Sequence, residues 1–186
     1  MSKNTHYHLV PHEEILKKHA APCGVITPDD LKEIEFMISV MVQNKAVGIA
    51  APQVGINKRM FIMNPTGRPE DRTLCINPVM TRHGNQIVKS REGCINFPEK
   101  KFVTVDRWAV IDVEYITVTY VKKWYVHKVT MKHWPAIVYQ HLMEYLDGPD
   151  NQVIKILMTG REDANQQTSS APDGLKSVDP ETKKEA

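Results

Sequence analysis

Apolar side chains recur at helical spacing in the first quarter of the chain and predict one amphipathic helix there. Residues 27–30 read Thr-Pro-Asp-Asp, which places a hydroxyl at the N-cap, proline in the first turn and two acids at the positive end of the helix dipole. The apolar stripe ends near Asn44, where we expect the helix to end. The stripe consists of Leu31, Ile34, Ile38 and Met41.

Short apolar runs and stretches of β-branched and aromatic residues predict strands in the middle of the chain. Residues 59–64 form an apolar run that ends at a proline, and residues 73–80 form a second short run. Residues 101–130 are richer still in valine, isoleucine, threonine and tyrosine. Within this stretch we expect residues 124–130 to be the hairpin partner of the strand that precedes them.

Helical periodicity returns between Pro135 and Gly148. Proline suits the first turn of a helix and glycine its end, so these two residues bound the predicted helix. Strands on both sides of one helix predict an α+β domain, which we expect to span residues 1–156. Residues 157–186 are rich in polar side chains and proline and have little to bury, so we expect them to form a polar, disordered tail.

The composition describes an ordinary globular chain of 186 residues, 41% hydrophobic and 25% charged, with a net charge of +2. So small a net charge, with scattered lysines and arginines, gives no direct sign of nucleic-acid binding. No apolar run approaches the roughly 18 residues that a membrane-spanning helix needs. Three cysteines without paired spacing indicate a reducing compartment, which we take to be the cytoplasm or the matrix of an organelle such as the mitochondrion.

Three short motifs contain the candidate functional residues. Residues 48–53 read Gly-Ile-Ala-Ala-Pro-Gln, residues 92–94 read Glu-Gly-Cys, and residues 140–148 read Gln-His-Leu-Met-Glu-Tyr-Leu-Asp-Gly. In this order, and over roughly residues 8–150, the chain resembles the peptide deformylases. Their motifs are Gly-x-Gly-Leu-Ala-Ala-x-Gln, Glu-Gly-Cys-Leu-Ser and Gln-His-Glu-x-x-His-Leu-x-Gly. The resemblance implies an α+β deformylase fold, with mixed β-strands around a central helix that carries the third motif.

The resemblance implies a metal site built from the cysteine of the second motif and the two histidines of the third. Carried over by position, Cys94 and His141 are retained, but Tyr145 stands at the third ligand. A phenol with a pKa of about 10 is a poor ligand at neutral pH, and a hydrolytic site needs three protein ligands. Glu144 shares a helix face with His141 and is the alternative third ligand. We expect no cofactor; the alternative is one divalent metal, iron, nickel or zinc.

Leu142 stands where the family has its general base, a glutamate that relays protons during hydrolysis. General acid–base catalysis contributes roughly 100- to 10,000-fold, and leucine has no titratable group. We therefore expect no catalytic residue. The loss of a ligand and of the base together argues against deformylase activity.

Other parts of the family's site are retained. The resemblance implies that the Gln53 side chain and the Ile95 backbone amide donate to an oxyanion, and that Gly48 lets a substrate backbone approach closely. Gly48 could equally serve to pack its loop against the central helix. Ala46 replaces the first glycine of the family's loop, and Lys101 stands where arginine is common.

These features predict a deformylase-like protein without catalytic activity, retained for binding or structure. Because the family acts on N-formylmethionyl chains that leave the ribosome, the resemblance implies a ribosome or nascent-chain partner. The alternatives are an active or weakly active metal-dependent deformylase, and a module that still binds formyl-methionine-like chains. Cys94 and His141 could also form a thiolate nucleophile, although the sequence offers no evident group to orient His141.

Overall fold

The structure is a computed structural model that describes residues 9–10, 14–97, 102–119, 123–148, 153 and 156. The expected polar tail, residues 157–186, lies outside the described residues, as does Lys101. Within the described part of the chain, neither helix combines the length and the apolar character that crossing a membrane requires.

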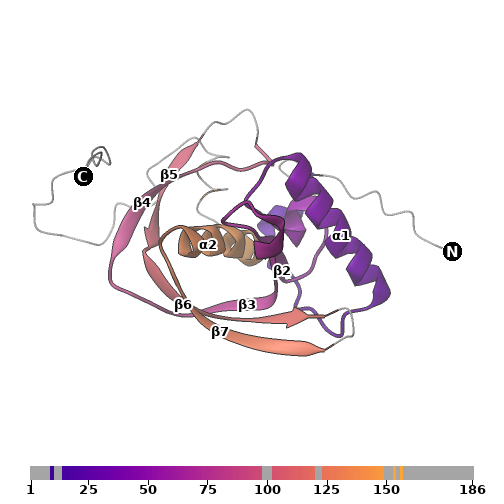
Figure 1. The fold of residues 1–186 in the computed structure, drawn as a ribbon. Helices are drawn as coiled ribbons and strands as arrows, with labels where there is room; N and C mark the ends of the chain where they lie inside the picture. The colour runs from indigo at the N-terminus through magenta and orange to yellow at the C-terminus, as the bar shows by residue number, and fades with distance from the viewer. Residues whose placement is uncertain are drawn as a thin grey trace, which may run out of the picture.

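Seven strands in the described part of the chain form two sheets (Figure 1). The larger sheet has the order β1-β2-β3-β6-β7, and β4 pairs with β5 in a separate two-stranded sheet. Every pairing between these strands is antiparallel, a simpler arrangement than the mixed strands expected. The strands are β1 (Gly48–Ala50), β2 (Met60–Met63), β3 (Thr73–His83), β4 (Ile87–Glu92), β5 (Val103–Trp108), β6 (Val110–Val118) and β7 (Trp124–Lys132). Short 3₁₀ helices are η1 (Glu14–Lys17), η2 (Ala51–Val54) and η3 (Pro69–Asp71).

The first helix, α1 (Pro28–Gln43), is the one predicted from the apolar stripe. Thr27 caps it: its side chain accepts a hydrogen bond from the Asp30 backbone N–H, and the Asp30 carboxylate accepts from the Thr27 backbone N–H at 2.6 Å. This reciprocal pair fixes the start of the helix. Its apolar face packs with residues of β1 and β2 in one core cluster, to which it contributes Ile34, Met37, Val40 and Met41.

The second helix, α2 (His133–Asp147), lies at the centre of the fold and contacts strands of both sheets (Figure 1). It begins two residues before the predicted Pro135 and ends at Asp147, with Gly148 as the C-cap, in agreement with the expected end at this glycine. Gly148 has a φ of +56°, and a Cβ there would clash with the Lys18 carbonyl oxygen, so glycine is required. The helix contributes Ala136, Val138, Tyr139, Leu142, Tyr145 and Leu146 to a second core cluster.

The strands expected from the apolar runs are confirmed. The predicted hairpin is formed by β6 and β7, which pair from Val110 with Lys132 to Val118 with Trp124. The small sheet was not predicted, and β4 shows why. The buried positions of β4 are Ser90 and Glu92, so this strand has no apolar inner face that a sequence pattern could reveal.

Candidate functional site

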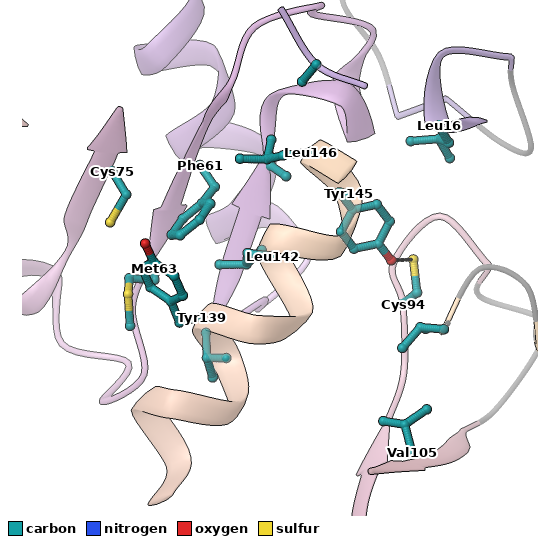
Figure 2. Packing of buried hydrophobic residues seen from close by; sticks show 14 of the residues in the cluster. Leu16, Phe61, Met63, Cys75, Cys94, Val105, Tyr139, Leu142, Tyr145 and Leu146 are labelled. Atoms are coloured by element: carbon teal, nitrogen blue, oxygen red, sulfur yellow. Dashed lines mark hydrogen bonds between the residues drawn. The ribbon is translucent and has the colours of Figure 1, made fainter. Parts of the chain in front are cut away.

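Tyr145 and Cys94, two of the expected ligand positions, are in direct contact. Tyr145 projects from α2 toward Cys94, which lies in the segment after β4 (Figure 2). The Tyr145 hydroxyl donates a hydrogen bond to Cys94 Sγ, with 2.6 Å between oxygen and sulfur. Tyr145 is 0% exposed and Cys94 8% exposed. The phenol therefore fills the space between the helix and the sulfur.

Both groups of this pair are neutral at ordinary pH. Burial raises the pKa of the Cys94 thiol, and hydrogen bonds from Tyr145 and from the Asn96 backbone N–H offset that rise only in part. Burial also raises the pKa of Tyr145, and the neighbouring Cys94 raises it further. Thiol and phenol ligands must lose their protons to bind a metal. The buried Tyr145 phenol, whose pKa is raised furthest from neutral pH, is therefore a poor metal ligand.

His141 is oriented by Glu92. Its Nδ1 lies 2.8 Å from Glu92 Oε2, and its ring meets the Tyr145 ring edge-on with 5.3 Å between centroids. The expectation that no group orients His141 was wrong, because Glu92 of the second motif lies against the helix. Among the described residues, no hydrogen bond joins His141 to Cys94. The Cys–His nucleophile pair is therefore not assembled.

A buried ion network holds Glu92 in place. Arg107 on β5 donates to both carboxylate oxygens of Glu92, from Nε at 2.8 Å and from Nη2 at 2.7 Å, and it also pairs with Glu144 on α2. Burial alone would raise the pKa of Glu92, but hydrogen bonds from Arg107 and His141 lower it to about 2. Because Glu92 and Arg107 are both buried, the charge of each is compensated mainly by the other rather than by water.

Glu144 takes part in this network and is not directed at the expected ligands. Besides pairing with Arg107, it accepts a hydrogen bond from the Val153 backbone N–H at 3.2 Å. Within the described ranges, no group of three His, Cys, Asp or Glu side chains is arranged to hold a metal ion. The geometry therefore gives no support to Glu144 as the third ligand.

Asn96 ties the first motif to the second. Its amide nitrogen donates to the carbonyl oxygens of Val10 and Gln53, at 2.9 and 3.0 Å, and its Oδ1 accepts from Gln53 Nε2 at 2.8 Å. Gln53 Oε1 in turn accepts from the Ala50 backbone N–H at 2.8 Å. Both ends of the Gln53 amide, expected to serve an oxyanion, are thus bonded within the protein.

Leu142 packs against Gly48 of β1. A Cβ at position 48 would lie 2.6 Å from Leu142 Cδ1, so the leucine would have to shift, and 3.0 Å from the Ile62 carbonyl oxygen, which is a tight contact. Leu142 is 2% exposed and belongs to the core cluster around α2. Tight packing of the loop against the central helix is therefore one role of Gly48.

We expect Gly48→Ala to lower the free energy of unfolding by about 1–3 kcal/mol, because the added methyl group overpacks this contact. Urea unfolding of the variant measures the loss. In a Leu142→Ala background the same change should cost less, since the leucine methyl is gone and the two positions are coupled. Gly24→Ala is the matched control, because a Cβ at Gly24 would meet nothing within 4 Å. Equal losses in the free energy of unfolding with and without Leu142 would show that positions 48 and 142 are not coupled.

A cavity of about 600 Å³ opens beside these residues. This volume lies in the usual range of ligand sites in proteins. Gln53, Ile95 and His141 line it, together with Gly48 and Leu142. Its remaining apolar walls come from Ala46, Val47, Phe97, Phe102, Trp134, Ile137 and Val138. The described lining of this cavity, next to the Cys94–Tyr145 contact, is therefore mostly apolar.

The donor set does not fit the divalent metal that the motifs imply. A tetrahedral hydrolytic site needs three protein donors and one open position. Here the third position is the buried phenol of Tyr145, and its hydroxyl donates to Cys94 Sγ. One ring nitrogen of His141 faces Glu92, so the other ring nitrogen is the one that could coordinate a metal. No catalytic step through a metal follows from this geometry.

The fold and the order of the three motifs define a deformylase-type α+β protein. The chain belongs to the polypeptide deformylase family, whose model matches residues 8–150. The peptide deformylase of Thermotoga petrophila is 35% identical over 136 residues, which cover 73% of this chain and 78% of that protein. The crystal structure of the Thermotoga maritima peptide deformylase has a TM-score of 0.67 and 31% identity, and the match covers 76% of this chain and 92% of that one. Peptide deformylase 1B, chloroplastic/mitochondrial, of Arabidopsis thaliana is 27% identical over 126 residues, or 66% of this chain and 44% of that protein.

Proposed function

We propose that this protein is a deformylase-like binding protein that recognises peptide chains without hydrolysing them. The observation that supports the proposal best is the hydrogen bond from Tyr145 to Cys94 Sγ, because a neutral phenol then occupies a ligand position. Leu142 supports it further, since a buried leucine at the position of the general base has no proton to move. In this proposal the His-x-x-Glu-Tyr sequence of α2 is the remnant of the family's His-Glu-x-x-His.

The retained cavity supports a binding role over a purely structural one. A protein kept only for its fold has no need of a cavity of about 600 Å³ with apolar walls. The partner in this proposal is a nascent or newly released polypeptide, bound by the domain of residues 1–156, with residues 157–186 as its tail. The compartment is the cytoplasm or an organelle matrix, consistent with three free cysteines and with the chloroplastic/mitochondrial relative.

We expect the protein purified without added metal to contain far less than one equivalent of iron, nickel or zinc, because its donors are protonated or engaged. It should also release no formate above background from the tripeptide formyl-Met-Ala-Ser. Elemental analysis and a formate assay measure these two quantities. The Cys94→Ser variant should give the same metal content as the unchanged protein. A stoichiometric metal that is lost in Cys94→Ser, together with formate release, would establish the active deformylase instead.

A further inference from the structure

Two cations at the rim of the cavity have no acidic partner among the described residues. Lys45, just after α1, and Arg91, on β4, both line the cavity and are exposed. Neither forms an ion pair with another described residue. The Arg91 guanidinium lies 4.5 Å from the centre of the Phe102 ring, which is also part of the cavity wall. This contact holds the Arg91 cation at the rim while its N–H groups remain able to donate.

The acidic charge near the cavity is already neutralised. Among the described lining residues, Glu92 is the one acid. Both of its oxygens accept from Arg107, and Oε2 also faces His141. The floor at Leu142 carries no charge. The described part of the cavity therefore combines apolar walls with an uncompensated positive rim.

We propose that the cavity recognises an acidic peptide, with an apolar residue inside and a carboxylate at the rim that pairs with Arg91 or Lys45. This inference rests on the proposed peptide-binding function and adds the class of ligand. Guanidinium and carboxylate pair through two parallel hydrogen bonds, so Arg91 suits this group better than a neutral one. The carboxylate comes either from an Asp or Glu side chain or from the C-terminus of a short peptide.

Calorimetric titration with four synthetic peptides tests the proposal. The neutral probe is formyl-Met-Ala-Ala amide, the side-chain acid probe is formyl-Met-Asp-Ala amide, the terminal acid probe is formyl-Met-Ala-Ala with a free carboxylate, and the basic probe is formyl-Met-Lys-Ala amide. At least one acid probe should bind about fivefold more tightly than the neutral probe, the size expected for one or two partly exposed ion pairs. The basic probe should bind more weakly than the neutral one. The acid probe that gains affinity identifies the source of the carboxylate.

Three variants separate the rim charges from other causes. The double variant Lys45→Gln with Arg91→Gln should lose the preference for the acid probe, and Arg91→Glu should turn it toward the basic probe. Lys128→Gln should keep the preference, because Lys128 lies on β7, is 72% exposed in its side chain and does not line the cavity. All four substitutions are at exposed side chains, and a thermal melt confirms that each variant is folded.

The outcomes distinguish this inference from the function on which it rests. Equal affinities for the acid, neutral and basic probes would overturn the acidic preference and leave peptide binding intact. A preference that survives in the double variant would also overturn it, since the rim cations would then not be responsible. If none of the four probes binds, both the proposed peptide-binding function and this inference fail.

Discussion

Replacing Arg107 by methionine is expected to lower the free energy of unfolding by about 3–5 kcal/mol, the usual cost of stranding a buried charge. Arg107 is 4% exposed and holds Glu92 by two hydrogen bonds, while its third contact neutralises Glu144. Methionine retains an apolar stem of similar length but donates nothing. Both carboxylates then remain near the core without a cation. Urea unfolding of the two proteins at neutral pH measures the difference.

Two controls test whether the lost charge pair is the cause. Arg82 on β3 is exposed, so Arg82→Met should change the free energy of unfolding by less than about 0.5 kcal/mol. Arg107→Met combined with Glu92→Met should recover part of the loss, because an apolar pair leaves no unpaired charge at that position. A single variant Arg107→Met as stable as the unchanged protein would show that the network contributes nothing.

The double change Leu142→Glu with Tyr145→His is expected to give a protein that binds zinc and releases formate at least about 100-fold above background, the lower bound for a positioned general base. Residues 141 and 145 are one helical turn apart on the same face. His141 is already oriented by Glu92, and removing Tyr145 frees Cys94 from its hydrogen bond. Zinc titration and the formate assay measure the two gains.

The single changes separate the roles of the two positions. Tyr145→His alone should restore zinc binding with little rate, and Leu142→Glu alone should do little, so the double effect should exceed the product of the single ones. Tyr145→Phe is the matched control, since it removes the hydroxyl without supplying a ligand, and it should bind no zinc. A double variant that binds zinc but is inert would implicate Ala46 or the bonded Gln53. One that binds no zinc would mean that the third motif is assigned wrongly.

Much of the fold follows from local patterns in the sequence. The helices α1 and α2 were predictable because their apolar residues repeat with the helical period and because Thr27 and Gly148 mark an N-cap and an end. The hairpin of β6 and β7 was predictable from its β-branched and aromatic residues. The small sheet was not, because its buried positions include Glu92 and Arg107, which are stable inside only when they meet.

The motifs indicated which residues belong to the candidate site but not what they contact. Tyr145 and Cys94 are 51 positions apart, and their hydrogen bond depends on how the segment after β4 packs against α2. No periodicity encodes such a contact. Asn96 and Arg107 lie outside the motif residues considered, and a single polar residue in a loop or strand gives no sign that it will be buried. Their roles follow from the hydrogen bonds alone.

The contact of Gly48 with Leu142 couples the first motif to the third. Leu142 Cδ1 occupies the place that a Cβ at position 48 would take. A side chain at 48 therefore requires the end of the Leu142 side chain to move. Any redesign of position 142 must take position 48 into account, because the space open to one side chain depends on the other.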